Sequence, residues 1–161
     1  MAPAFLSRVN YFNYPIDNGI KFNNKPLLGK NKTYRGVIGG IIFSIIVSYI
    51  QYILYINNIF REINLVNYDL INPLFLGLLM GFGAIMGDLF ESLIKRQLNF
   101  KPGESFYFFD QTDWVIGTII VSIPFFNLNI IFISLSMIMF FLLHILIKHL
   151  GYYLKLEKSK W

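Results

Sequence analysis

Four apolar stretches alternate with polar segments along the chain. They span residues 37–60, 73–98, 113–126 and 130–154, and the first has no charged residue. A helix that crosses a bilayer needs about 20 mostly apolar residues. The pattern therefore predicts an all-α polytopic membrane protein with four transmembrane helices. Only residues 127–129 separate the last two stretches, so these helices should form an antiparallel pair.

The composition supports a membrane protein. The 161 residues are 55% hydrophobic and only 14% charged, whereas soluble domains are about 25% charged. A chain of this length forms one compact unit, so we expect a single membrane-embedded domain over residues 1–161, in which residues 1–36 precede the first helix. The sequence has no cysteine, which excludes disulfides, thiolate metal ligands and a cysteine nucleophile.

The positive charges follow a topological rule. All but one of the 14 lysines and arginines lie before the first helix, in the segment 95–101, or near and beyond the end of the last helix; the exception is Arg61. Because Lys and Arg concentrate in cytoplasmic loops, these segments should face the cytoplasm from the cell membrane. We therefore attribute the net charge of +5 to topology and predict no nucleic-acid partner.

The second apolar stretch carries a charged cluster. Asp88, Ser92, Lys95 and Arg96 are spaced to share one helical face. A charged residue deep in a spanning helix costs about 2.5–3.5 kcal/mol, and such residues usually face a cavity or a partner. The alternative is a plain helix end, at which Lys95 and Arg96 extend to lipid headgroups.

Two further acids stand at the start of the third stretch. Asp110 and Asp113 are three residues apart and can share a helical face. Helix capping would need only one of them. Together with Asp88 they form an oxygen-rich set of the kind that binds Mg²⁺. We therefore expect Asp88, Asp110 and Asp113 to converge around a divalent metal.

A basic segment, GKNKTYRG at 29–36, precedes the first helix. Its backbone N–H groups, with Lys32 and Arg35, can hold a polyphosphate, although topology alone also accounts for basic residues here. No Ser-His-Asp set is apparent, and we interpret His144 and His149 as packing or interfacial residues. Activation of a phosphorus electrophile is thus favoured over covalent catalysis.

These motifs resemble those of a known family. GDLFESLIKR at 87–96, KPG at 101–103, FDQTDWVIG at 109–117, KTYRG at 32–36 and Pro15-Ile-Asp17 resemble the CDP-archaeol synthases, the archaeal-type branch of the CDP-diacylglycerol synthases. The resemblance implies a Mg²⁺-dependent enzyme that transfers CMP from CTP to a lipid phosphate in the membrane and releases pyrophosphate. It favours an archaeal-type diether glycerol phosphate as the substrate.

The resemblance also implies roles for individual residues. Asp88, Asp110 and Asp113 would be metal and catalytic acids, joined in catalysis by Lys95. Lys95 and Arg96 would bind phosphate with support from Ser92. The nucleotide would be held by Lys32, Thr33 and Arg35, which would make residues 1–36 a cytoplasmic nucleotide-binding segment.

Several alternatives stay open. The family has five spanning helices, and we expect the first to be missing here, with Met1–Ser7 resembling the residues just after it. Buried acids also mark ion paths, so an ion-translocating protein is the alternative function. The chemistry of the lipid tails, the number of metal ions and the oligomeric state, a homodimer included, are not determined by these motifs.

Overall fold

The computed structural model describes residues 13–59, 61–63, 66–101, 104, 106 and 109–153. It contains helices α2 (Tyr34–Ile56), α3 (Pro73–Gln97), α4 (Phe109–Ser122) and α5 (Ile130–Tyr153) and a short 3₁₀ helix, Arg61–Ile63. Strands β1 (Lys21–Phe22) and β2 (Lys25–Pro26) form an antiparallel hairpin. The all-α prediction is confirmed. The expectation about a missing first helix concerns residues outside the described ones.

Three of the four helices can cross a membrane. α2, α3 and α5 are 23, 25 and 24 residues long and strongly apolar, and α5 buries none of its residues. α4 has only 14 residues, which corresponds to about 21 Å and is less than the roughly 30 Å hydrocarbon core. Exposed Ile, Leu and Phe side chains on α2 and α5 therefore face lipid, as expected of a polytopic membrane protein.

Local signals explain where the helices begin and end. α2 starts three residues before the predicted position because Thr33 caps it, its Oγ1 accepting from Gly36 N at 3.3 Å. It ends at Ile56, before Asn58 adopts a left-handed φ of 57°. Asn72 caps α3 in the same manner, accepting from Leu74 N at 2.8 Å. α4 spans 109–122 rather than 113–126: Asp110 N already donates to Phe106 O at 3.0 Å at its start, and the helix ends two residues before Pro124.

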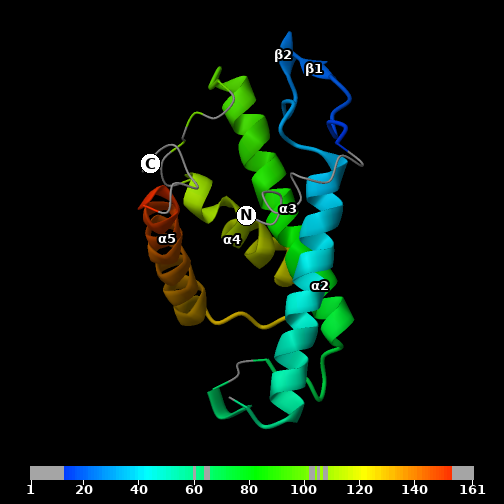
Figure 1. The fold of residues 1–161 in the computed structure, drawn as a ribbon, viewed down its shortest axis with the longest axis vertical. Coiled ribbons are helices and arrows are strands. Elements are labelled where there is room, and N and C mark those ends of the chain that lie inside the picture. The colour runs from blue at the N-terminus through cyan, green and yellow to red at the C-terminus, as the bar shows by residue number, and fades with distance from the viewer. Residues whose placement is uncertain are drawn as a thin grey trace.

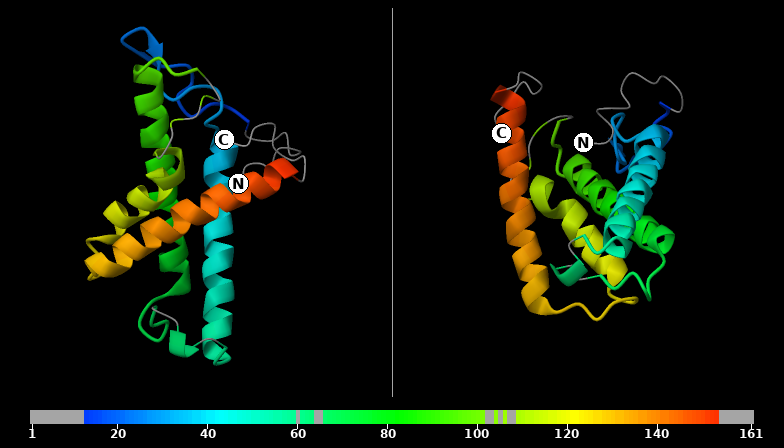
Figure 2. Two further views of the ribbon diagram at one scale, coloured as in Figure 1. Left: turned by 90° about the vertical axis from the view of Figure 1, so that its left-hand side faces the viewer. Right: turned by 60° about the horizontal axis from the view of Figure 1, so that its bottom comes forward.

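The helices are arranged around α3. α2 packs on one side of α3 and α4 on the other, while α5 leans along α4 on the side away from α2 (Figures 1 and 2). The β1–β2 hairpin, the C-terminal end of α3 and the N-terminal end of α2 lie at one end of the molecule, which we call the polar end. The α2–α3 connection lies at the opposite end (Figure 1).

Glycines on α3 allow both neighbours to approach closely. On the α2 side, a Cβ added at Gly77 would lie 2.6 Å from Ile45 Cα, and one at Gly81 would lie 3.2 Å from Ile41 Cα. Both distances are shorter than van der Waals contact, so only glycine fits at Gly77 without a shift of the backbone. Gly77 and Gly81 therefore let the backbones of α2 and α3 approach closely.

A second set of glycines joins α3 to α4. A Cβ at Gly83 would lie 2.6 Å from Thr118 Cα, and one at Gly87 would overlap the carbonyl oxygen of Asp113. From the other side, a Cβ at Gly117 would overlap the carbonyl oxygen of Gly83 and lie 2.6 Å from Gly87 N. The two backbones therefore touch, and residues next to Gly87 and Asp113 are held together.

The connection at the opposite end has its own small core. Tyr55, Tyr68 and Leu76 are buried against one another. The Tyr55 hydroxyl donates to Asp69 Oδ2 at 2.9 Å, and Arg61 Nη2 pairs with the same oxygen at 3.0 Å. This end is ordered by polar contacts that involve none of the predicted site residues.

Replacing Gly117 with alanine should weaken the α3–α4 contact. The added methyl group overlaps the backbone of α3, and such overpacking costs about 1–3 kcal/mol. Gly117→Ala should therefore lower the thermal unfolding temperature measured in detergent. The matched control is Gly40→Ala, whose new Cβ meets only the flexible end of Ile85 at 3.3 Å. Equal stability of the two variants would contradict the packing role of Gly117.

Candidate active site

The segment before α2 folds back on itself at the polar end. Pro15 and Thr33 form an antiparallel bridge, Ile16 N donates to Lys32 O at 2.9 Å, and Tyr34 N donates to Tyr14 O at 3.1 Å. The intervening residues form a closed loop, 15–33, with the β1–β2 hairpin at its tip. Both ends of the loop are thereby fixed at the start of α2.

Asp17 organises this loop from the inside. Its side chain is buried, with 5% of the residue exposed, and its carboxylate accepts from the backbone N–H groups of Gly19, Leu28 and Gly29 at 3.0–3.1 Å. Burial by itself would raise the pKa of Asp17, but these backbone donors outweigh it and hold the pKa below its ordinary value of 3.8. The carboxylate thus stays charged and joins both halves of the loop.

The loop is docked onto α3 at three points. Lys25 Nζ donates to Gln97 O at 2.6 Å, at the C-terminal end of the helix. Gly29 has a φ of 92°, and a Cβ there would lie 3.6 Å from Arg96 Cδ. Lys32 Nζ forms an ion pair with Asp88 Oδ1 at 2.6 Å. Lys32 is therefore held over the acids of α3.

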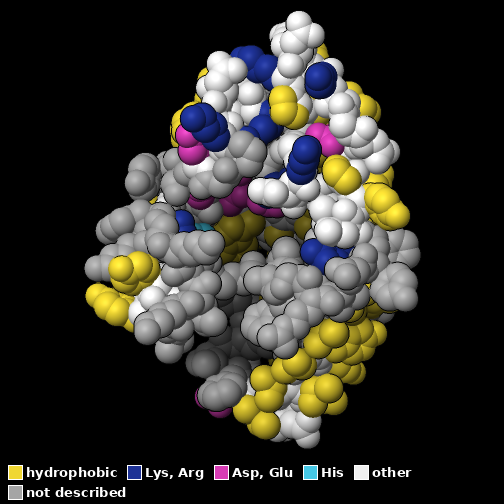
Figure 3. Space-filling model, turned by 45° about the horizontal axis from the view of Figure 1, so that its top comes forward, with side chains coloured by type: hydrophobic (Ala, Val, Ile, Leu, Met, Phe, Trp, Pro, Cys, Tyr) yellow, Lys and Arg dark blue, Asp and Glu magenta, His cyan; other side chains and the backbone are white. Residues whose placement is uncertain are grey.

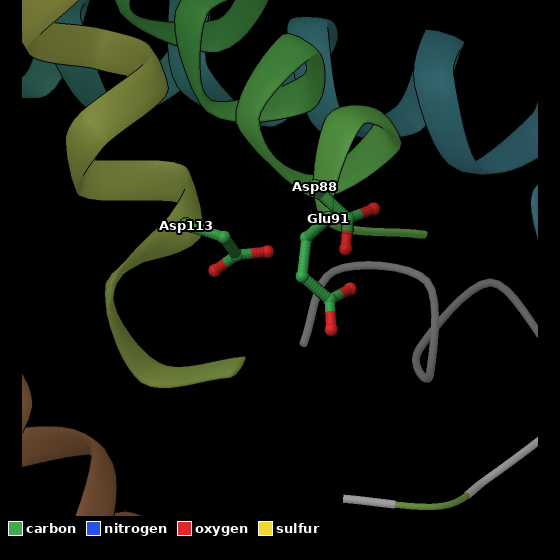
Figure 4. A group of neighbouring side chains, drawn as sticks. All are labelled: Asp88, Glu91 and Asp113. Carbon is green, nitrogen blue, oxygen red and sulfur yellow. The ribbon is translucent and has the colours of Figure 1, made fainter. Parts of the chain in front are cut away.

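Three carboxylates converge between α3 and α4. Asp88, Glu91 and Asp113 each offer an oxygen, and these oxygens lie within 4.8 Å of one another. Figure 4 shows the three side chains reaching into one space between the two helices. Asp88 and Glu91 share a face of α3, and the contact of Gly87 with the Asp113 carbonyl brings in the third acid. Residues 22 or more positions apart are thereby combined in one group.

This group of acids fits a divalent cation. Oxygen ligands of Mg²⁺ lie about 2.1 Å from the ion, so two of them are at most about 4.2 Å apart. A spread of 4.8 Å is within reach of small side-chain rotations. Hard carboxylate oxygens are also the donors that Mg²⁺ and Ca²⁺ prefer. Asp88, Glu91 and Asp113 can therefore hold such an ion.

Asp110 has a different local partner. It lies outside the group of three and accepts from Lys95 Nζ at 2.9 Å and from Phe106 N at 3.1 Å. Lys95 Nζ also lies 2.9 Å from Glu91 Oε1. Lys95 is buried, with 8% exposed, so it joins two acids in the interior rather than extending to lipid headgroups.

The remaining predicted residues line two cavities. Ser92, Lys95 and Arg96, with Lys30, Lys32 and Glu91, surround a small cavity of about 120 Å³ beneath the 28–32 turn. Buried Ser92 and the buried Nε of Arg96, which has no hydrogen-bond partner within the described chain, belong to this cationic cavity. Thr33 and Arg35 line a second, larger cavity, and Thr33 also caps α2.

The larger cavity, of about 960 Å³, is polar on one side and apolar on the other. Its polar wall comes from residues 30–33 and Arg35 with Asp88, Asp110 and Asp113, and its apolar wall includes Ile85, Leu89, Trp114, Phe140, Leu143 and Ile147. Figure 3 looks toward it from the polar end, where basic and acidic side chains surround a hollow with hydrophobic side chains deeper inside.

The structure brings together most of the residues that the sequence singled out, but it regroups them. Asp88 and Asp113 are neighbours as expected, whereas Glu91 takes the third position in the acidic group and Asp110 pairs with Lys95. Asp88 and Glu91 are three residues apart and so share one helical face, which is the sequence feature from which the position of Glu91 beside Asp88 could have been predicted. Trp114 and His144 line the large cavity, and nothing in their sequence context indicated this.

Comparisons with known sequences match this chain to CDP-archaeol synthases. The sequence model of the CarS-like family, described as CDP-archaeol synthase, matches residues 6–161. The CDP-archaeol synthase of Methanosarcina barkeri is 32% identical over 177 aligned residues that cover all of both chains. The CDP-archaeol synthase of Methanospirillum hungatei is 29% identical, again over all of both chains.

A solved structure shares the fold. It belongs to an intramembrane enzyme for archaeal membrane lipid biosynthesis and superposes with a TM-score of 0.69, covering 89% of this chain and 83% of that one. Because the sequence identity is only 23%, this comparison shows a shared fold, that is, the same arrangement of helices.

Removing the charge of Asp17 should loosen the loop. Asp17→Asn keeps one acceptor oxygen but loses charge-assisted bonds worth about 1.5–3 kcal/mol each, so amide hydrogen exchange at Leu28 and Gly29 should accelerate about tenfold or more. The matched control is Asp69→Asn, an acid at the opposite end of the molecule. In the unsubstituted protein, the stabilisation by Asp17 is complete above its ordinary pKa of 3.8 and disappears as pH falls through the lower folded value. Unchanged exchange in Asp17→Asn would contradict this role.

Proposed function

The chain belongs to the CarS-like family of CDP-archaeol synthases, and on this basis we propose that it transfers CMP from CTP to the phosphate of an archaeal-type diether glycerol phosphate. As a member of this family it is a cytidylyltransferase of archaeal lipid synthesis embedded in a membrane. Beyond this activity of the family, we propose which lipid is the substrate, which residues bind each reactant, which metal is bound, and which side of the membrane the site faces.

The large cavity supports this function best, because one part of its wall is polar and charged and another part is apolar. Its polar wall carries acids for a cation and basic residues for phosphates, and its apolar wall is formed by helices that face lipid. A soluble polar nucleotide and a lipid anchored in the membrane can both reach one reaction centre only in a cavity of this kind. An ion path would instead require polar residues along the depth of the membrane, whereas α2 has no charged residue after Arg35 and α5 has no ionisable residue before His144.

We propose that the polyphosphate of CTP lies against the 28–33 turn. Lys32, Lys95 and Arg96 supply positive charge around the small cavity, and Ser92 supplies a hydroxyl group. Thr33 and Arg35 line the adjoining part of the large cavity. Charge-assisted hydrogen bonds from such groups are the usual means of holding phosphate oxygens. Asp17 contributes indirectly, by fixing the turn that carries Lys32.

We propose Mg²⁺ as the cation held by Asp88, Glu91 and Asp113, with Asp110 beside them. When bound, it would neutralise charge that develops on the phosphates of CTP. The acids otherwise have Lys32 and Lys95 as their partners. The same lysines can turn to phosphate oxygens, since a flexible lysine exchanges partners at little cost.

The proposed reaction is a direct displacement at phosphorus. An oxygen of the lipid phosphate attacks the α-phosphorus of CTP, forming a new P–O bond. The bond from the α-phosphorus to the oxygen that bridges to the β-phosphorus breaks, and pyrophosphate leaves with that electron pair. Lys95, buried between Glu91 and Asp110, is positioned to stabilise charge on the departing group.

The direct test is product formation. We expect the purified protein to convert CTP and a diether glycerol phosphate to CDP-lipid and pyrophosphate in the presence of Mg²⁺, and to use a fatty-acid ester of glycerol phosphate more slowly. Chromatography of radiolabelled CDP-lipid measures both substrates side by side. Absence of CDP-lipid from either substrate would overturn the proposed function, and preference for the ester would overturn the proposed lipid.

Neutral replacements in the acidic group should remove most of this activity. Asp88→Asn, Glu91→Gln and Asp113→Asn each delete one charge near the reacting phosphates, for which a loss of about 100-fold or more is typical. Asp69→Asn is the matched control, since Asp69 pairs with Arg61 far from the cavity. Full activity in Glu91→Gln, with loss in Asp110→Asn, would assign the third ligand to Asp110 instead.

The site should face the cytoplasm, where CTP is available. Because the chain has no cysteine, single substitutions Lys21→Cys, Lys101→Cys and Glu62→Cys can be labelled in intact cells without background. We expect a membrane-impermeant maleimide to label only the Glu62 variant, and to label the other two after permeabilisation. Labelling of all three variants from outside would contradict the orientation.

A further inference from the structure

One polar side chain interrupts the apolar wall of the large cavity. α5 contributes Phe140, Leu143, His144 and Ile147 to this wall, and only His144 among these can form hydrogen bonds. Phe140 and His144 are four residues apart and lie on the same helical face. An ionisable residue on a spanning helix that faces a cavity usually has a functional role.

A contact between α4 and α5 indicates where His144 lies along the large cavity. The rings of Trp114 and Phe140 meet edge to face, with centroids 4.9 Å apart. α4 runs away from the polar end and α5 returns toward it (Figure 2). One turn from Trp114 toward the polar end is Asp110, and one turn from Phe140 in the same direction is His144. Asp110 and His144 therefore both lie on the polar-end side of the Trp114–Phe140 contact, and both line the large cavity.

Three other polar side chains of α5 lie within hydrogen-bonding distance of backbone carbonyls of the same helix. Ser134 Oγ donates to Ile130 O at 2.9 Å, and Ser136 Oγ donates to Ile133 O at 2.8 Å. His149 Nδ1 lies 2.9 Å from Ile145 O, and His149 is not among the residues that line the cavity. These bonds satisfy polar groups within an apolar helix. His144 itself faces a cavity that it shares with Lys32, Asp88, Asp110 and Asp113.

The reaction requires two separate phosphate sites. Lys32, Lys95 and Arg96 gather around the small cavity on the α3 side, which suits the polyphosphate. The lipid phosphate must lie where its tails can leave along apolar side chains. His144 has Phe140 and Ile147 one turn to either side of it, so a phosphate at the imidazole would have apolar wall next to its tails.

From this position we propose that His144 binds the lipid phosphate, its imidazole donating a hydrogen bond to a phosphate oxygen, and so orients the attacking group toward the α-phosphorus. The assignment rests on the proposed function, because it presupposes a lipid phosphate as acceptor. It makes α5 the element that recognises the lipid headgroup, while α3 and the 15–33 loop recognise the nucleotide.

The test separates the two substrates. His144→Gln keeps a hydrogen-bonding side chain of similar reach, and His144→Ala removes it. We expect His144→Ala to raise the KM for lipid phosphate about tenfold to a hundredfold, the range for loss of a hydrogen bond to a charged group, with the KM for CTP unchanged. His144→Gln should recover part of the loss. Binding of the lipid phosphate to protein in nanodiscs without CTP should weaken in parallel.

The matched control is His149→Ala, the same change five residues further along α5 and away from the cavity. It should leave both KM values as they are. Equal KM values for lipid phosphate in His144→Ala and the unsubstituted protein would overturn the assignment while leaving the proposed function intact, since CDP-lipid would still form. A parallel rise of both KM values would also overturn it, because that result indicates a general structural role. If the unsubstituted protein makes no CDP-lipid, the proposed function itself fails.

Discussion

The direct contact between the backbones of α3 and α4 is the constraint on which the site depends. Gly83, Gly87 and Gly117 allow it, because a Cβ at any of them would overlap the facing helix. Asp88 follows Gly87, and the carbonyl that Gly87 touches belongs to Asp113. The acids are therefore placed by the helix crossing itself, and their approach does not depend on the loop that connects the two helices.

Acids held this close require opposite charge. Lys95 comes from α3 itself and pairs with Glu91 and Asp110, whereas Lys32 comes from the loop before α2 and pairs with Asp88. That loop has no long hydrophobic segment, and Asp17 takes over the role of a core by binding three backbone N–H groups. A buried carboxylate thus replaces apolar packing as the organiser of a small polar element, and the order of the loop and the charge of the site are linked.

The sequence predicts the fold better than the detailed site. Hydropathy locates all four helices, because a long apolar segment in a bilayer must satisfy its own backbone hydrogen bonds and therefore forms a helix. Glycine spacing on α3 predicts close packing, but it does not identify the partner, so the role of Gly117 emerges only from the three-dimensional contact. For the same reason the sequence did not single out Glu91, which lies with Asp88 and Asp113, or the pairing of Asp110 with Lys95. Spacing along one helix is evident from the sequence, whereas side-chain pairing across two helices depends on their crossing. The position of His144 could not be predicted from the sequence, because the cavity that it faces is formed largely by other segments of the chain.

The position at which α4 meets α3 explains why the acids lie below the polar end of the molecule. α4 meets α3 at Gly87, ten residues before α3 ends at Gln97, which corresponds to about 15 Å along the helix. The acids therefore lie in a recess below the polar end, with the 15–33 loop above them and α5 beside them. Under the proposed function, this position would let a nucleotide enter from the polar end and a lipid headgroup approach from within the membrane. If α4 instead began level with the end of α3, Asp113 would move toward the surface while α3 kept Asp88 and Glu91 at their present depth, and the three acids would no longer meet.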